Sequence, residues 1–328
     1  MSASLSTYPE ALAATSAYFE RHGCSPANAA SVARALVGAE MDGLKGHGLS
    51  RLLTYRSMLE SGKADGQAVP QAKRTAPGVI AVDAACGFAY PAIDLAIDLL
   101  DPITREQGIA VAAIDRSNHS GAAGLHVERL ARGGLVALMF ANTPGAMAPW
   151  GGRSAVFGTN PIAFAAPMSG PGPAVVDLSL SKAARGNLLA AKQKGEAIPL
   201  GWALDPDGNP TDDPNAGLAG TMIPMGDAKG AALAFMVEVL AACLTGAHLA
   251  FEASSFLDAE GGPPETGQLL IALSPDAFGH GHFGERIAAL AAAIEAQPGA
   301  RLAGSRRFKV RAENMARGIQ LPSELAAK

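Results

Sequence analysis

The stretch GIAVAAIDRSNHSGAAG, residues 108–124, decides the fold class. Its first part, Gly108–Asp115, is a run of apolar and β-branched residues, which predicts a buried strand. Its second part, SNHSGAA at 117–123, places polar groups where that strand ends and a helix of small residues begins. Such a segment makes a natural cradle for an anion or another ligand. An ordinary strand-to-helix turn capped by Asn and His is the alternative interpretation.

The segments on either side alternate between strand and helix. Val79–Val82 predicts a strand, Pro91–Glu106 a helix and Leu135–Ala141 another buried strand. This order indicates an α/β protein. Because several later connections are too short to hold a crossover helix, we expect a mixed strand order in the sheet.

The first 60 residues predict a helical region. Apolar residues in Ala11–Phe19 recur near helical spacing, and Gly23 ends that helix. Ser25-Pro26 supplies an N-cap and a proline at the first helical position of a second helix, which continues to about Met41. A third helix is expected over Leu49–Glu60. Later expected elements are strands over Val175–Leu178 and Gln268–Leu273 and helices over Ala183–Lys194, Ala231–Leu244 and Glu285–Ala296.

The composition is that of a protein with a substantial core. The 328 residues are 48% hydrophobic and 17% charged, with a net charge of −4. This composition excludes a disordered chain and gives no general attraction to nucleic acid or to an anionic membrane. Cys24, Cys86 and Cys243 form no CxxC pair, which is typical of reduced intracellular thiols. The N-terminus shows no secretory signal, so we expect a cytoplasmic protein.

The segment GHGHFG, Gly279–Gly284, matches the dinucleotide-binding pattern G-x-G-x-x-G. That motif needs a strand leading directly into the turn and an acidic residue about 20 positions later. Here Ser274–Phe278 separates the predicted strand from the glycines, and the acidic residue is missing. His280 and His282 have no evident third ligand for a metal ion. We interpret the segment as a flexible surface loop and expect no metal site.

The segment GHGLSR, Gly46–Arg51, carries the residues most suited to chemistry. His47 precedes the third predicted helix and Arg51 lies in its first turn, so both side chains can point into a site at that helix N-terminus. A substrate carboxylate there would receive the guanidinium fork and the helix dipole. His47 could then donate or accept a proton beside it. A capping role for His47 and a solvated Arg51 are the alternative.

Further segments concentrate polar or conformationally restricted residues. Ala148–Gly152 and Phe157–Pro161 are dense in Gly and Pro, which suits the wall of a pocket. Asp177–Ser181 presents an acid and two hydroxyls where a strand ends. Ser305–Arg311 is a dense basic cluster in an acidic chain, and its arginines can hold a phosphate through paired hydrogen bonds. A solvated surface run is the alternative interpretation of that cluster.

Over almost its whole length the chain resembles the malate/L-lactate dehydrogenase family of NAD(P)H-dependent oxidoreductases, which is unrelated to the Rossmann-type enzymes. The resemblance is carried, in the family's order, by GHGLSR, SNHSGAAG, APWGG, FGTNPIAFAAP, IPLGWALDPDGNPTDDP and GDAKGAALAFMVEVLAACLTGA. Within the family, the chain is most similar to the Δ1-pyrroline-2-carboxylate/Δ1-piperideine-2-carboxylate reductases, through DLSLSKAARGN, MGDAKGAALAFMVE and EASSFLDAEGGPPETGQ. The resemblance implies a homodimer, a non-Rossmann α/β fold with a predominantly antiparallel cofactor sheet, and NADPH preferred over NADH.

The resemblance also implies roles for individual residues. His47 corresponds to the family's proton donor, Arg51 to its carboxylate-binding arginine and Thr159 to a substrate contact. The cofactor-contacting positions that it implies are His119, Ser120, Gly121, Ala122, Ala123, Asp177, Leu178, Ser179, Lys229, Gly304, Arg306 and Arg307. We accordingly expect a helical, substrate-side domain over residues 1–115, with 297–328 packing back on it, and an NADPH-binding domain over 116–296.

Two positions depart from the family's pattern. The residue before the catalytic histidine is usually serine and is Gly46 here, and an acid often found after the Ala-Arg-Gly run is Asn187 here. Together those two side chains would form a relay that orients the histidine. The departures put the relay and the tuning of His47 in doubt, and not the fold.

The resemblance predicts NADPH-dependent reduction of a cyclic imine carboxylate to L-proline or L-pipecolate. Arg51 would hold the carboxylate and His47, cationic near neutral pH, would supply the proton to nitrogen. One alternative is a 2-hydroxyacid dehydrogenase that uses the same pair on malate, lactate or ureidoglycolate. Another is a nucleotide-binding family member that has lost catalysis.

Overall fold

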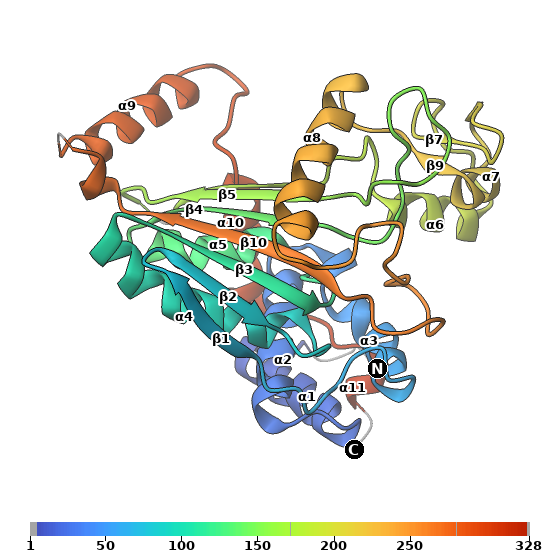
Figure 1. Ribbon diagram of the computed structural model, residues 1–328, viewed down its shortest axis with the longest axis horizontal. Coiled ribbons are helices and arrows are strands. Elements are labelled where there is room, and N and C mark those ends of the chain that lie inside the picture. Colours follow the sequence, from blue (N-terminus) through green and yellow to red (C-terminus); the bar gives the residue numbers. More distant parts are fainter. Residues whose placement is uncertain (1–4, 171, 280, 327–328) are drawn as a thin grey trace.

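The computed structural model describes residues 5–170, 172–279 and 281–326. Its centre is a seven-stranded sheet with helices on both faces (Figure 1). The strand order across the sheet is β1-β2-β3-β10-β4-β5-β6. The strands are β1 (Gln71–Ala76), β2 (Val79–Asp83), β3 (Ile109–Ser117), β4 (Val136–Ala141), β5 (Ile162–Ala166), β6 (Ala174–Leu178) and β10 (Thr266–Leu273).

The pairing within this sheet is mostly antiparallel. β2 and β3 are parallel and are joined by the crossover helix α4 (Ala89–Gln107), as a parallel pair requires. The other neighbouring pairs are antiparallel, including both pairs made by β10. The mixed strand order and the non-Rossmann, predominantly antiparallel sheet are therefore confirmed.

Residues of the strands alternate between two cores. Ala110, Ala112 and Ile114 of β3 pack toward α4 and toward α5 (Ala123–Arg132). The opposite face of the sheet packs against α8 (Ala228–Glu238), which continues into a π-helical turn over Val239–Cys243. Figure 1 shows α4 and α5 on one side of the sheet and α8 on the other.

The N-terminal region is helical, as expected. It contains α1 (Tyr8–Arg21), α2 (Pro26–Met41) and α3 (Leu52–Glu60). Ser25 caps α2, because its Oγ accepts a hydrogen bond from the amide of Asn28 at 3.3 Å. Buried residues of these helices form a third cluster together with residues near the C-terminus.

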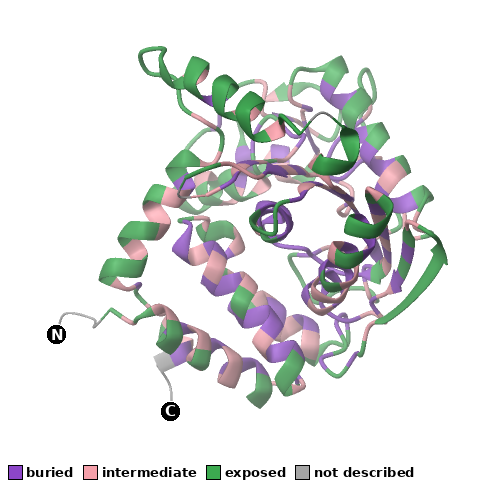
Figure 2. Cartoon of the chain, turned by 90° about the vertical axis from the view of Figure 1, so that its left-hand side faces the viewer, coloured by how far each residue is buried: buried purple, intermediate pink, exposed green. Residues whose placement is uncertain are grey.

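The C-terminal segment returns to the N-terminal helices. After β10 the chain forms α9 (Phe283–Glu295), α10 (Ser305–Arg317) and α11 (Ser323–Ala326). Ser6 and Ile319 form a β-bridge, and Figure 2 shows α1 and the helices that follow it as partly buried ribbons against the rest of the molecule. The central sheet takes strands from both sides of residue 115, and the predicted division into domains remains a prediction.

A smaller unit lies between β6 and α8. It consists of α6 (Arg185–Lys194), α7 (Pro214–Ala219) and a three-stranded sheet in the order β8-β7-β9. Its short strands are β7 (Ala203–Leu204), β8 (Pro210–Thr211) and β9 (Thr221–Met222).

The glycine pattern at 279–284 does not form a dinucleotide turn. A 3-10 turn, η4 (Pro275–Phe278), lies between β10 and Gly279, and α9 begins at Phe283. His280 lies outside the described residues. In the part of the chain that is described, no three His, Cys, Asp or Glu side chains gather as a metal site, and no helix is long and apolar enough to cross a membrane.

Candidate active site

The GHGLSR segment forms two consecutive 3-10 turns before α3. These turns are η1 (Lys45–His47) and η2 (Leu49–Arg51). Glycine is needed at position 48, because a Cβ there would lie 2.3 Å from Oε2 and 3.1 Å from the backbone nitrogen of Glu40. The segment therefore passes directly against α2, and this close contact fixes its shape.

His47 and Arg51 are held close together by these turns. Arg51 folds back on the segment, with its Nε donating to the carbonyl of Gly46 at 2.7 Å. Burial and the nearby Arg51 charge lower the pKa of His47 to about 4. The ring is therefore neutral at physiological pH, which corrects the expectation of a cationic His47. Its Nδ1 is buried and has no hydrogen-bond partner among the described residues.

His119 lies directly beside His47. The two rings are stacked, with centroids 5.4 Å apart and planes 20° apart. Nδ1 of His119 lies 2.6 Å from Oη of Tyr55, which lies 2.7 Å from Oη of Tyr90. The structure thus brings together His47, Arg51 and His119 and adds two tyrosines that the sequence analysis missed. Tyr55 follows Arg51 by one helical turn, and that spacing was the available signal.

The segment His119–Ala123 leads into the N-terminus of α5, where a second group of predicted residues meets. The amide of Gly124 donates to Oδ2 of Asp177 at 2.8 Å. A Cβ on Gly124 would lie 2.7 Å from Nη1 of Arg307 and 2.9 Å from Cβ of Asp177. Asp177 is open to solvent, and yet desolvation by the surrounding protein raises its pKa.

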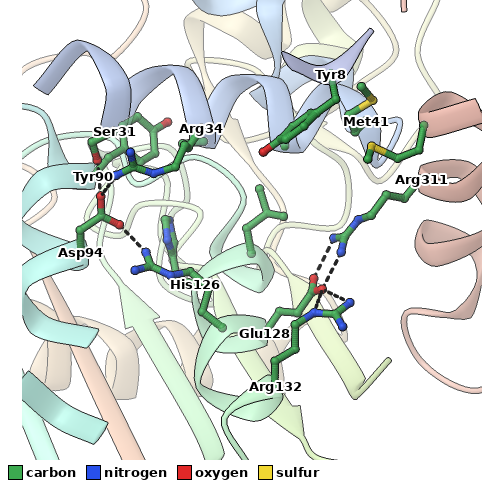
Figure 3. A pocket seen from close by; sticks show the side chains of 15 residues that line it. Tyr8, Ser31, Arg34, Met41, Tyr90, Asp94, His126, Glu128, Arg132 and Arg311 are labelled. Atoms are coloured by element: carbon green, nitrogen blue, oxygen red, sulfur yellow. Dashed lines mark hydrogen bonds and ion pairs between the residues drawn. The ribbon is translucent and has the colours of Figure 1, made fainter. Parts of the chain in front are cut away.

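Arg307 forms ion pairs with two carboxylates. Its Nε lies 3.0 Å from Oδ2 of Asp42, and its Nη2 contacts Glu128. Arg311 pairs with the same two carboxylates, and Arg132 also binds Glu128 (Figure 3). This network ties α10 to α2 and α5. Nη1 of Arg307 is buried beside the α5 N-terminus and has no hydrogen-bond partner among the described residues.

Thr159 lies next to the end of β6. Its amide donates to Oγ1 of Thr143 at 2.9 Å, and its carbonyl accepts from the amide of Leu180 at 2.8 Å. The neighbouring Ser179 has its Oγ 3.2 Å from Oγ of Ser181. Thr159 therefore lies near the Asp177–Ser179 segment, within the second group of predicted residues.

The remaining predicted cofactor residues lie on two helix N-termini. Gly304 caps α10 with φ of +85° and rests on β6, where a Cβ would lie 3.1 Å from the carbonyl oxygen of Val175. Arg306 follows in the first turn of α10 and is exposed. Lys229, in the first turn of α8, is also exposed. Arg306 and Lys229 are thus the cations that remain accessible from the predicted set.

Lys63 organises a loop beside His119 that the sequence analysis did not identify. Its side chain is fully buried, and Nζ donates to the carbonyls of Ser255 at 2.7 Å and Glu260 at 2.6 Å. This loop carries Phe256, whose ring centroid is 5.2 Å from that of His119. No local sequence signal identifies Lys63, because its partners lie almost 200 residues later.

A separate cavity of about 470 Å³ lies between α1, α2, α4, α5 and α10 (Figure 3). Its charged groups are paired with one another: Arg34 and Arg129 bind Asp94, while Arg132 and Arg311 bind Glu128. Neither His47 nor Arg51 lines it. The candidate active site is therefore elsewhere, at the start of α3.

The two departures from the family pattern leave His47 without a relay. A Cβ at Gly46 would have no heavy atom within 4 Å, and Asn187 is exposed at the start of α6.

The sequence profile described as malate/L-lactate dehydrogenase matches residues 7–328. The chain belongs to the malate/L-lactate dehydrogenase family. It is 53% identical, over 88% of its length and 86% of the relative's, to the (2R)-3-sulfolactate dehydrogenase (NADP(+)) of Chromohalobacter salexigens. It is 43% identical, over 90% of its length and 87% of the relative's, to the Δ1-pyrroline-2-carboxylate/Δ1-piperideine-2-carboxylate reductase of Pseudomonas putida.

A solved structure supports the same assignment. The Δ1-piperideine-2-carboxylate reductase of Pseudomonas syringae is 40% identical and superimposes with a TM-score of 0.93, covering 98% of this chain and 97% of that one. Relatives of this kind are reductases or dehydrogenases, and the protein is an oxidoreductase.

Proposed function

We propose that the protein is an NADP(H)-dependent dehydrogenase that interconverts a small 2-hydroxy acid and its 2-oxo acid. The observation that carries this proposal is the pair of 3-10 turns that holds the His47 imidazole beside the Arg51 guanidinium. A neutral imidazole is the form that accepts a proton from a substrate hydroxyl, and a guanidinium beside it suits a carboxylate on the neighbouring carbon. The 53% identity to a 3-sulfolactate dehydrogenase supports the same substrate class.

In this proposal Arg51, His47 and Thr159 have different roles in substrate binding and proton transfer. Arg51 binds the substrate carboxylate and so fixes C2 and its hydroxyl against the imidazole. His47 takes the hydroxyl proton, while the hydrogen on C2 leaves with its electron pair. Thr159 supplies a hydroxyl contact to the substrate. In the reverse direction the substrate's negative charge offsets that of Arg51, which favours the protonated His47 needed to return the proton.

The proposed cofactor is NADP(H), which supplies or accepts the hydride when bound. The α5 N-terminus fits such a group, because a helix N-terminus favours an anion and a buried guanidinium nitrogen of Arg307 lies beside Gly124 with no hydrogen-bond partner in the described chain. Gly124 leaves no room for a side chain at that point. We propose that His119–Ala123, Asp177–Ser179 and Gly304 hold the cofactor, with the exposed Arg306 and Lys229 pairing with its phosphates.

A second candidate function is the reduction of Δ1-pyrroline-2-carboxylate or Δ1-piperideine-2-carboxylate. It is supported by 43% identity to one such reductase and by the fit to the structure of another. A cyclic imine that already carries a proton on nitrogen needs a hydride and no proton donor, so a neutral His47 is also compatible with it.

We further propose a cytoplasmic homodimer. Supporting the dimer, the outer side of α8 and its continuation carries exposed apolar side chains, and Figure 1 shows α8 at the edge of the molecule. These side chains are Leu233, Phe235, Met236 and Val239. Sedimentation of the wild type and of Phe235→Glu checks this point, and a monomeric wild type would contradict it.

One assay set tests the proposed function. NADP⁺ is offered with (2R)-3-sulfolactate, L-lactate and L-malate, and NADPH with both cyclic imines and with 2-oxo acids, each repeated with the non-phosphorylated cofactor. Turnover of hydroxy and oxo acids, abolished in His47→Gln, is the expected result. Turnover of the imines alone would replace the proposal by the second candidate. Cofactor binding with no turnover of any substrate would identify an inactive family member.

A further inference from the structure

Three buried side chains from three elements form one hydrogen-bonded chain behind His47. Tyr90 on α4 contacts Tyr55 on α3, and Tyr55 contacts Nδ1 of His119, at 2.7 and 2.6 Å. The exposed fractions of Tyr55, Tyr90 and His119 are 1%, 2% and 8%. Burial raises the pKa values of both phenols and lowers that of His119, so all three groups are neutral at physiological pH.

The number of protons determines the direction of this chain. A neutral phenol has one proton to donate, and within the described chain Tyr90 Oη has no partner other than Tyr55. If His119 donated to Tyr55 and Tyr55 to Tyr90, the buried hydroxyl proton of Tyr90 would have no acceptor. The opposite direction satisfies every proton: Tyr90 donates to Tyr55, and Tyr55 donates to Nδ1 of His119. A neutral imidazole that accepts at Nδ1 carries its proton on Nε2.

The ring of His119 also packs against two other rings. His47 stacks on it at 5.4 Å, and Phe256 packs against it at 5.2 Å. Nε2 of His119 makes no hydrogen bond within the described chain, while the backbone amide next to the ring is tied to the Asn118 side chain at 2.8 Å. Both the plane of the ring and its tautomer are therefore defined before any ligand binds.

We infer that Tyr55 is a positioning residue that holds His119 as the Nε2–H tautomer, so that it offers a fixed hydrogen-bond donor beside His47 to the reacting oxygen or nitrogen of the substrate. This inference rests on the proposed function for the identity of the reacting atom. A fixed donor at that atom stabilises the charge that develops there during hydride transfer. It also gives the site an ordered proton arrangement where Gly46 and Asn187 leave His47 without a relay.

The first test compares Tyr55→Phe, Tyr90→Phe and the double variant for turnover and thermal stability. Tyr55→Phe removes the donor to His119, so we expect kcat to fall about tenfold or more. It also leaves the buried Tyr90 hydroxyl without a hydrogen-bond acceptor, so we expect the melting temperature to fall by about 2–4 °C. The double variant removes that stranded hydroxyl. Its stability should recover toward the wild type while its kcat stays as low as that of Tyr55→Phe.

A low kcat with recovered stability in the double variant distinguishes positioning of His119 by Tyr55 from a merely structural role. If the role were only structural, kcat would recover together with stability. Tyr90→Phe leaves Tyr55 able to donate and should keep kcat within about threefold of the wild type. The matched control is Tyr18→Phe, which removes a buried phenol hydroxyl that lies outside the site. It should change neither kcat nor the tautomer of His119.

The second test measures the tautomer itself on the substrate-free protein by ¹⁵N NMR of labelled histidine, with the His119 signal assigned through His119→Gln. The wild type and Tyr90→Phe should show the proton on Nε2, and Tyr55→Phe should show a mixture of tautomers. A proton on Nδ1 in the wild type, or an unchanged tautomer in Tyr55→Phe, would overturn the inference. Because this measurement needs no substrate, it supports or refutes the positioning even if the substrate panel refutes the proposed function.

Discussion

The low pKa of His47 predicts a specific loss of stability in mild acid. In the folded chain His47 titrates near pH 4, and its ordinary value is 6.5. Between these two values the unfolded chain binds a proton that the folded chain does not. The free energy of unfolding therefore falls as the pH drops from 6.5 toward 4, and His47 contributes no such loss above 6.5.

The magnitude follows from the two pKa values. The full difference corresponds to about 3.4 kcal/mol below pH 4, and about 1.4 kcal/mol of it has developed at pH 5.5. The assay is urea unfolding of the cofactor-free wild type and His47→Gln at pH 7.5 and 5.5. Both proteins lose stability in acid because burial also lowers the pKa values of His119 and His126. The wild type should lose about 1.4 kcal/mol more than the variant.

The cause of the low pKa is tested by Arg51→Gln. Burial is the larger cause and the Arg51 charge the second, so this substitution should reduce the His47 contribution without removing it. Losses in acid that agree within about 0.3 kcal/mol between the wild type and His47→Gln would refute the neutral, buried His47 on which the proposed proton transfer depends.

Three further predictions concern other parts of the site. Arg51→Ala should raise KM about 10- to 150-fold in steady-state assays, because it removes a charge-assisted contact to the substrate carboxylate. Arg51→Lys should restore only part of the lost affinity, and a KM within twofold of the wild type in Arg51→Ala would show that the carboxylate binds elsewhere. Arg306→Ala should weaken NADPH more than NADH in fluorescence titrations, whereas Arg307→Ala should mainly lower stability because Arg307 is paired with carboxylates. Lys63→Met should lower the free energy of unfolding by about 2–4 kcal/mol in urea titrations, because two partly buried carbonyls lose a charged donor. An unchanged midpoint would contradict this.

Much of the fold follows from local pattern, because most elements carry their own hydrophobic period and end signals. The exceptions depend on neighbours. β1 has all six residues exposed and lacks the alternation of a strand, and it forms because β2 pairs with it across a Pro77-Gly78 turn. β5 is a short apolar run inside a segment rich in Gly and Pro, and its pairing with β4 and β6 makes it a strand.

In the candidate site, too, residues in local motifs could be predicted from the sequence, and contacts between distant residues could not. The segments GHGLSR and SNHSGAAG could be recognised in the sequence, and they contain His47, Arg51 and His119. Their local features are a close backbone contact at Gly48 and the end of a strand before His119. The ion pairs of Arg307 could not be predicted, since Asp42 and Glu128 lie 265 and 179 positions away in the sequence. A basic cluster that suggests a phosphate site in sequence thus serves largely to join α10 to two other helices.

The place of β10 at the middle of the sheet has a consequence for synthesis of the chain. β10 separates β3 from β4, which run parallel to each other across it, and it is the last of the seven strands to be made. At about 5–20 residues per second, the ribosome takes about 4–18 s to move from the end of β6 to the start of β10. During that interval the nascent protein holds two half-sheets, each with an edge of unpaired amides and carbonyls. Factors that shield strand edges during translation should therefore govern its yield, and a chain that stops before residue 266 should aggregate rather than fold as a smaller unit.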